Sequence, residues 1–105
     1  MTRQDWYAIP CPQGFVRHHV ITEQAVRRAH GDLFDPRNCL VLHWKTHLDH
    51  HAGKPLPLSR VPDSAISFAV ETLGIGPAVN ELRRRYAGSD ARVEALAEAW
   101  AMSDV

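Results

Sequence analysis

Two short apolar runs in the first half of the chain predict two β-strands. The run FVRHHVI, residues 15–21, is rich in β-branched and aromatic side chains, which favour strands. A second run of the same kind, CLVLH, covers residues 39–43. Residues 1–14 contain two prolines and a glycine near their end and predict an irregular lead-in to the first strand.

The remaining segments show the apolar spacing and the end signals of helices. Apolar residues recur at intervals of three and four positions, as at Ala65, Phe68, Ala69 and Leu73, so that one helical face is apolar. Glycine or proline ends several of these segments. Residues 53–62 interrupt the pattern with three prolines and predict an extended connector. The segments that we expect to be helical are 23–30, 44–52, 64–73, 77–87 and 91–102.

These elements predict an α+β fold in a single domain over residues 1–105. Strand, loop, strand and short helix occupy residues 15–52, and the helices of residues 63–102 form a C-terminal extension. The first of these units buries too little apolar surface to be stable alone. We therefore expect the helical extension to pack on it.

Composition narrows the class of protein further. The chain has 12 basic and 12 acidic residues, a balance that argues against tight, sequence-independent DNA binding through net charge. No apolar run is long enough to span a membrane, and the N-terminus lacks the apolar stretch of a secretory signal. Two cysteines without a C-x-x-C pair exclude a four-cysteine zinc site. We therefore expect a protein of the reducing cytoplasm without a membrane partner.

Histidine is the unusual component, with seven residues, six of them in two short clusters. Histidine is the commonest metal ligand, and it titrates near neutral pH. In a helix, His47 and His51 lie on one face, so both imidazoles can bind one ion. The pair His18 and His19 is the obvious source of a third ligand, and the ring that stays off the metal can accept a proton. Asn38 can donate and accept hydrogen bonds at once, which suits it to tie its loop to the histidine-bearing strand.

The order His-His, Asn, His and His resembles the motif of the HNH endonucleases, also called ββα-metal or His-Me finger nucleases. The resemblance rests on HH at 18–19, DPRNCLVLHWKTH at 35–47, and His51. The spacing is similar to that of the nuclease colicins, and the surrounding residues are similar to small HNH proteins of bacteriophages and their hosts. The motif covers about a third of the chain, and the tail is more weakly similar to the phage type.

The resemblance implies a ββα-metal core with a C-terminal helical extension, and a role for each motif residue. His18, His47 and His51 would bind one divalent metal ion. His19 would be the general base that activates water, and Asn38 would orient the loop and through it His19. The implied reaction is hydrolysis of a DNA phosphodiester bond that leaves 5′-phosphate and 3′-hydroxyl ends.

The sequence leaves the metal and the biological role open. Zn²⁺, Ni²⁺, Mn²⁺ and Mg²⁺ all remain candidates, because imidazoles suit the softer ions and Mg²⁺ can be recruited with DNA phosphate. DNA is the expected substrate in a bacterial host cell, with low sequence specificity or with direction by a phage or host protein. One alternative is a non-catalytic, metal-stabilised module that binds DNA or protein. The other is a phage accessory factor in packaging or anti-defence.

The chain departs from many HNH proteins around the motif. It lacks the two C-x-x-C pairs that often flank the site, and the loop inside the motif has 18 residues. His43 stands where a cysteine often occurs, and we expect it near the site, touching a ligand or phosphate. His50 is three positions after His47 and is the rival of His51 as third ligand; the i,i+4 alignment favours His51.

Basic residues that flank the motif are the candidates for contact with a phosphate backbone. A separate run, RRR at 83–85, fans around a helix whose Leu82 and Tyr86 would face the core. We therefore expect this run on a solvated surface, with contact to a phosphate backbone as the alternative. The candidates for phosphate contact are Arg17, Arg37, Lys45 and Lys54.

Overall fold

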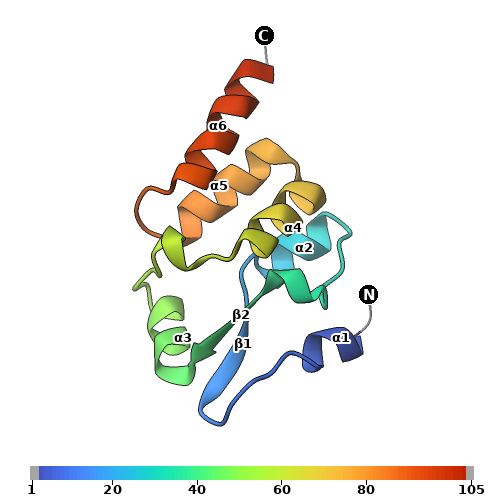
Figure 1. Cartoon of the computed structure of the whole chain (residues 1–105), viewed down its shortest axis with the longest axis vertical. Coiled ribbons are helices and arrows are strands. Elements are labelled where there is room, and N and C mark those ends of the chain that lie inside the picture. The colour runs from blue at the N-terminus through green and yellow to red at the C-terminus, as the bar shows by residue number, and fades with distance from the viewer. Residues whose placement is uncertain (1–2, 104–105) are drawn as a thin grey trace.

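The computed structural model describes residues 3–103, and residues 1–2 and 104–105 lie outside the described part. The two strands and α3 occupy one end of the molecule, and α4, α5 and α6 occupy the other (Figure 1). In chain order the elements are α1 (Arg3–Tyr7), β1 (Phe15–His19), α2 (Glu23–Arg28), β2 (Cys39–His43), α3 (Trp44–His51), α4 (Asp63–Leu73), α5 (Ile75–Arg85) and α6 (Ala91–Ser103), with 3₁₀ turns at Pro36–Asn38 and Leu58–Arg60. The predicted α+β class is confirmed.

Strands β1 and β2 form a two-stranded antiparallel sheet, with Phe15 opposite His43 at one end. Helix α3 follows β2 without a loop, because Nδ1 of His43 accepts a hydrogen bond from the Lys45 N–H (3.3 Å) and caps the helix. α3 contacts both strands. The predicted order of strand, strand and helix is present; β2 has the predicted bounds, and β1 ends at His19.

The first strand ends earlier than predicted because the next two residues leave the sheet and enter the core. Val20 and Ile21 are both fully buried. The Val20 N–H donates to the Asn38 carbonyl oxygen (2.9 Å), and the Ile21 N–H donates to Oδ1 of Asn38 (2.8 Å). Asn38 therefore replaces the hydrogen bonds that a longer strand would have made.

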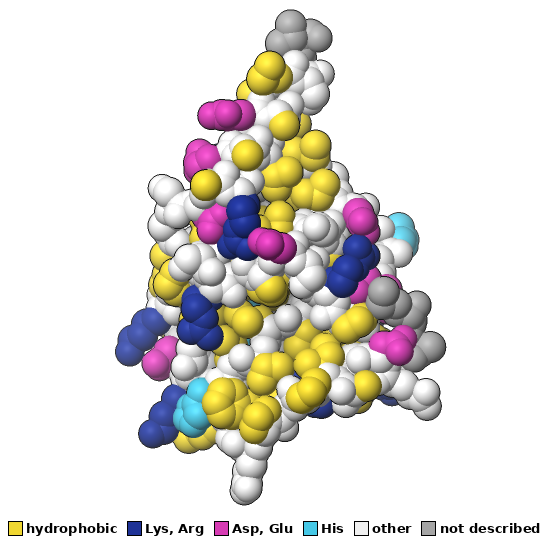
Figure 2. Space-filling model, in the orientation of Figure 1, with side chains coloured by type: hydrophobic (Ala, Val, Ile, Leu, Met, Phe, Trp, Pro, Cys, Tyr) yellow, Lys and Arg dark blue, Asp and Glu magenta, His cyan; other side chains and the backbone are white. Residues whose placement is uncertain are grey.

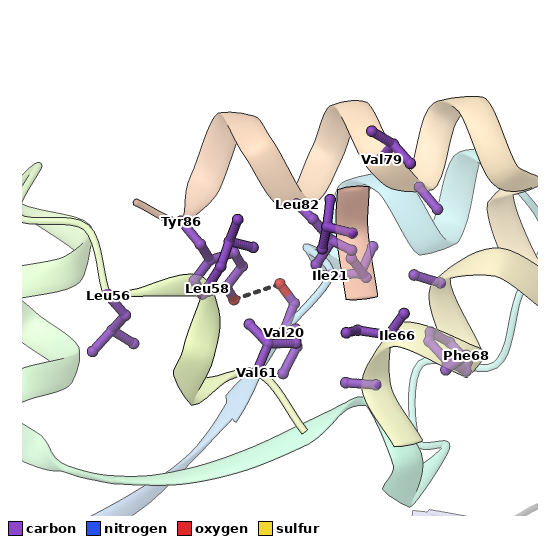
Figure 3. Packing of buried hydrophobic residues seen from close by; sticks show 14 of the residues in the cluster. Val20, Ile21, Leu56, Leu58, Val61, Ile66, Phe68, Val79, Leu82 and Tyr86 are labelled. Atoms are coloured by element: carbon purple, nitrogen blue, oxygen red, sulfur yellow. Dashed lines mark hydrogen bonds between the residues drawn. The ribbon is translucent and has the colours of Figure 1, made fainter. Parts of the chain in front are cut away.

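One hydrophobic core joins the two halves of the chain. Its buried residues come from the end of β1, from α2 and β2, from residues 56–61, and from α4, α5 and α6. Figure 3 shows Val20 and Ile21 packed among Leu82, Phe68 and their neighbours. Burying such a side chain contributes roughly 1.5–3 kcal/mol. Since most residues of the cluster follow residue 52, the helical extension supplies much of the apolar surface that stabilises the fold.

The lead-in before β1 is not irregular throughout, because α1 forms within it. Trp6 is 3% exposed, and its ring packs on His19. The Arg17 guanidinium holds the segment by donating to the carbonyl oxygens of Tyr7 (3.0 Å) and Ile9 (2.8 Å). The prediction was wrong because a helix of five residues is too short to show apolar spacing in the sequence.

The connector between α3 and α4 contributes buried residues to the core and pairs with the backbone at Ala87, neither of which its proline content predicts. The Leu58 N–H donates to the Ala87 carbonyl oxygen, and the Ala87 N–H donates to the Leu56 carbonyl oxygen, both at 2.8 Å. Leu56 and Leu58 are buried in the core. The segment is extended as predicted except at its 3₁₀ turn.

The five predicted helices are present, with ends that differ by up to two residues. α2 stops at Arg28, and His30 then takes a left-handed conformation (φ 57°). α5 begins at Ile75 and ends before Tyr86, whose extended backbone directs the ring into the core. α6 packs through Val93 and exposes hydrophobic side chains beyond it, of which Met102 is 76% exposed (Figure 2). In the described part of the chain, no helix has the length and apolar character needed to cross a membrane.

Candidate metal centre

Three histidine side chains converge where β1 meets α3. The ligand nitrogens of His18, His47 and His51 all lie within 4.8 Å of one another. The Nε2 atoms of His47 and His51 are 3.0 Å apart, as expected for residues on successive turns of one helical face. Three imidazole nitrogens this close can bind one divalent cation and leave positions for water or a substrate oxygen.

Local structure explains why the sequence brings these rings together. Side chains alternate along β1, so His18 faces the interior and is 2% exposed, whereas His19 projects from the other side. α3 starts directly after the partner strand and packs back on the sheet. His47 and His51 then meet His18, with ring centroids 5.2 Å and 6.0 Å away from it.

A tyrosine hydroxyl fixes the tautomer of His18. The Tyr86 hydroxyl donates to the Val20 carbonyl oxygen (2.7 Å), so it accepts from the Nε2–H of His18 (2.9 Å). This leaves Nδ1 of His18 unprotonated and able to bind a cation. Burial, followed by the neighbouring His50 and His47, lowers the pKa of His18 to about 3. The ring is therefore neutral near pH 7, which is the form that binds metal.

His19 lies beside the three-histidine group without joining it. Its Nε2–H donates to the Leu33 carbonyl oxygen (3.2 Å), and its Nδ1 is 3.8 Å from Oε1 of Glu23. The ring stacks on Trp6, with centroids 4.2 Å apart. Burial lowers the pKa of His19, and the Glu23 carboxylate partly opposes this. A neutral ring held in this way keeps a lone pair on Nδ1 that can accept a proton.

Asn38 is fully buried and ties its loop to the segment that follows His19. Its Nδ2–H donates to the Ile21 carbonyl oxygen (3.0 Å), and its Oδ1 accepts from the Ile21 N–H (2.8 Å). The amide therefore donates and accepts at once, as the sequence suggested. Because these bonds fix the backbone two residues after His19, they limit where that imidazole can lie.

His50 lies on the inner side of the group and has a different set of partners. It is 8% exposed, and its ring stacks on Tyr86 with centroids 5.3 Å apart. Its Nε2 accepts a hydrogen bond from Nη2 of Arg85 (3.2 Å). Of the two rival ligands the structure places His51 in the group, while His50 packs edge-on against His18 at 5.0 Å.

His43 serves the start of α3. Besides capping the helix, its ring lies edge-on to Phe15 (5.5 Å between centroids) and beside Trp44 (5.9 Å). Among residues 3–103 the ring contacts of His43 are with Phe15 and Trp44, not with a candidate metal ligand. We therefore assign His43 to the junction of β2 and α3.

A cleft of about 620 Å³ opens beside the histidines. His18, His47 and His51 border it together with His19, so the candidate ligands and the candidate base face the same space. Both neighbours, His18 and His19, reach the cleft because β1 ends there. The cleft is also bordered by Trp6, Arg17, Glu23 and Arg85.

Both arginines among the four cations expected to contact phosphate are engaged by the protein itself. Arg17 borders the cleft, but its guanidinium donates to two backbone carbonyl oxygens of the lead-in. Arg37 lies away from the cleft lining and bonds to two carboxylates, Asp35 (3.0 Å) and Glu71 (2.6 Å). Arg37 therefore joins the 3₁₀ turn before β2 to α4 and does not line the cleft.

The two lysines also lie outside the cleft lining. Lys45 sits over the Trp44 ring, with Nζ 5.5 Å from its centroid, and Lys54 is 4.0 Å from Asp49. Lys45 belongs to α3, whose residues point in all directions around the helix axis, so nearness to the motif in the sequence does not by itself bring a side chain to the cleft. Arg85, which we expect from the sequence on a solvated surface, instead reaches the cleft from the end of α5.

Two residues of the site, Trp6 and Tyr86, were therefore missed as functional candidates, and Arg85 belonged to a run for which phosphate contact was only the alternative. The run RRR was a visible signal for Arg85, but nothing local distinguished it from its two neighbours. Trp6 and Tyr86 carried no signal beyond their apolar rings, because both reach histidines that are distant in the sequence.

Comparisons with protein-family models, with curated proteins and with solved structures found no match.

Proposed function

We propose that this protein is a metal-dependent DNA endonuclease with a ββα-metal core formed by β1, β2 and α3. The observation that supports this best is the convergence of His18, His47 and His51, with a fourth imidazole, His19, bordering the same cleft. A metal site that only stabilises the fold would not need an unliganded histidine in the same cleft.

The donor set fits a divalent cation. Burial lowers the pKa of His18 and also that of His47, so both rings are neutral and can donate a lone pair at neutral pH. Three imidazoles suit Zn²⁺ or Ni²⁺ by softness, while Mn²⁺ or Mg²⁺ would need oxygen ligands from DNA phosphate. Bound there, the ion would supply positive charge to stabilise the scissile phosphate and the leaving 3′ oxygen.

The chain's own residues supply the proton acceptor and its orientation. Nδ1 of His19 can take a proton from an attacking water, because Nε2–H is already donated to Leu33. Glu23, 3.8 Å from Nδ1, would stabilise the imidazolium that forms. Asn38 holds the backbone beyond His19, and Trp6 holds the face of the ring.

We choose DNA as the substrate because of the resemblance of the motif, and we infer the degree of sequence specificity from the fold. Residues 3–103 pack around one hydrophobic core, and within this stretch no separate unit is set apart to read base sequence. We therefore propose cleavage with low intrinsic sequence specificity, or direction by a phage or host protein partner in the bacterial cytoplasm.

Metal titration tests the site itself. We expect the chelator-treated protein to take up one equivalent of Ni²⁺ or Zn²⁺ and to melt at a higher temperature when loaded; binding at 100 times the dissociation constant adds about 2.7 kcal/mol. His47→Ala and His51→Ala should lose both effects. His30→Asn is the matched control, because His30 is exposed, lies outside the group, and has a left-handed backbone that asparagine tolerates.

Plasmid nicking tests the reaction. With Mg²⁺, Mn²⁺, Ni²⁺ or Zn²⁺ present, we expect the parent and His30→Asn to relax supercoiled plasmid. His19→Ala should lose about 10²–10⁴-fold in rate, the usual contribution of a general base, and keep its metal affinity. A protein that binds metal but leaves plasmid intact under every ion would be the non-catalytic module, and the endonuclease proposal would be wrong.

A further inference from the structure

A second hollow of about 330 Å³ lies next to the cleft. It is lined by His50, His51, Gly53, Pro55, Arg84 and Arg85. None of these residues is acidic, and two of them carry a guanidinium group. His51 and Arg85 line the cleft as well, so the two hollows share a border at a candidate metal ligand.

Arg85 differs from the two arginines that precede it. Arg83 bonds to Glu94 (2.8 Å) and Arg84 bonds to Glu81 (2.8 Å), each an acidic side chain. Among residues 3–103 no carboxylate is described within salt-bridge distance of Arg85; its Nη2 donates to the neutral His50, and its buried Nε has no partner there. The positive charge of Arg85 is therefore not neutralised by the described part of the protein.

The helix ends that meet here account for part of this arrangement but not all of it. α3 and α5 both end at this hollow, and a helix C-terminus carries about half a negative charge that favours a nearby cation. That partial charge is spread over the carbonyl groups of a helix end, whereas Arg84 is paired directly with Glu81, whose side chain is 22% exposed. Arg85 is thus the guanidinium of this hollow that has no carboxylate partner among residues 3–103.

We infer that Arg85, with Arg84 beside it, forms a phosphate-binding site for the DNA backbone next to the metal centre. This inference rests on the proposed function and assigns the hollow to the phosphate adjacent to the scissile one. A strand that places one phosphate at His18, His47 and His51 passes His51 to enter the second hollow. A guanidinium can bind phosphate oxygens through two parallel hydrogen bonds, which would fix the orientation of that phosphate.

DNA binding without metal tests the inference apart from the chemistry. A fluorescein-labelled DNA duplex is titrated in EDTA, and its anisotropy is followed for the parent and for Arg83→Gln, Arg84→Gln and Arg85→Gln. Glutamine is shorter than arginine but keeps a polar end on an unbranched stem, and it removes the charge. Arg83→Gln is the matched control, because Arg83 lies in the same run and outside the lining of both hollows.

We expect Arg85→Gln to weaken binding by about tenfold, and Arg84→Gln by a smaller factor. The slope of log affinity against log salt should decrease by about one for each phosphate contact removed. Arg83→Gln should bind within about twofold of the parent. Inorganic phosphate at matched ionic strength should compete with the duplex in the parent and not in Arg85→Gln.

Equal affinity and equal salt slope for Arg85→Gln and Arg83→Gln would overturn the inference. Uptake of one Ni²⁺ by Arg85→Gln shows that its histidine group is intact, so that weak DNA binding cannot be attributed to unfolding. If Arg85→Gln binds DNA more weakly than Arg83→Gln while the parent cleaves no plasmid with any ion, the endonuclease proposal is wrong and the phosphate site is supported. If the parent cleaves and Arg85→Gln matches Arg83→Gln, only the phosphate site fails.

Discussion

The indole of Trp6 lies face to face with the imidazole of His19, with ring centroids 4.2 Å apart and planes inclined by 16°. The two residues belong to different elements, α1 and β1, and Arg17 holds them together through the carbonyl oxygens of Tyr7 and Ile9. One face of His19 is thereby covered, and one nitrogen is bound to Leu33. The orientation of the proposed base thus depends on a segment outside the motif.

Replacing Trp6 should affect cleavage and spare the metal site. Trp6→Leu removes the flat ring that supports His19, and we expect the nicking rate to fall by about tenfold, a fraction of what a general base contributes. Trp6→Phe keeps an aromatic face and should recover most of the rate. The affinity for Ni²⁺ should stay unchanged in both, as measured by calorimetry.

The control for this substitution is Trp100→Leu, which alters a half-exposed indole on α6. Trp6→Leu also removes buried surface, so rates are compared at a temperature where circular dichroism shows every variant folded. Equal rates for Trp6→Leu and Trp100→Leu would show that the stack does not orient His19.

Asn38→Ala should destabilise the fold strongly. The substitution leaves the buried N–H and carbonyl oxygen of Ile21 without partners, which costs about 1–3 kcal/mol for each group. We expect a decrease in the free energy of unfolding of about 2–4 kcal/mol, measured by urea denaturation. Asn80→Ala, at an exposed position of α5, should change it by less than about 0.5 kcal/mol; a similar loss in both variants would contradict the prediction.

Tyr86→Phe should weaken metal binding although Tyr86 is not a ligand. The hydroxyl accepts the Nε2–H of His18 and donates to Val20, so its removal frees the ring and leaves a buried carbonyl oxygen unpaired. Loss of such a supporting hydrogen bond costs about 10–100-fold in metal affinity. Competition against a chromogenic chelator measures the effect, with Tyr7→Phe as control. An unchanged affinity would mean that His18 is held in place by packing alone.

The chelator-treated protein should lose stability as pH falls below neutrality. Burial lowers the pKa of His18 to about 3 from the ordinary 6.5, and lowers the pKa values of His47 and His50 as well. Between about pH 3 and pH 6.5, the unfolded chain therefore binds more protons than the folded one. The stabilisation is therefore complete above pH 6.5 and is lost progressively toward pH 3, at up to about 1.4 kcal/mol per pH unit for each group.

Urea midpoints measured in EDTA from pH 7.5 down to about 4.5 check this slope before carboxylates dominate the titration. His18→Asn removes the group with the largest shift, and its profile should be flatter than that of the parent. A parent whose midpoint stays constant or rises over this interval would contradict the assignment of a buried neutral ring at position 18.

The elements and the three-histidine group could be predicted because each depends on spacing over few residues. The alternation of a strand separates His18 from His19, and one helical turn aligns His47 with His51. The antiparallel pairing of two nearby strands then leaves few ways to place the helix. Even the choice of His51 over His50 followed from the i,i+4 rule.

The surroundings of the group could not be predicted, because they depend on contacts between residues far apart in the chain. Tyr86 is 68 positions from His18, and Arg85 is 35 positions from His50. An apolar ring at position 86 signals burial but not the direction of its hydroxyl. The short α1 likewise has no periodicity to detect, so Trp6 gave no sign that it would cover His19.

The link from Tyr86 to His18 has a consequence for the order in which the protein is made. Every histidine of the chain is synthesised by residue 51, but the hydroxyl that sets the proton on His18 is added 35 residues later. A nascent chain on the ribosome therefore carries all its imidazoles before it can arrange them. Translation has to proceed past residue 86 before the proposed cation site can be completed, so a product that stops earlier lacks the hydrogen bond that orients His18.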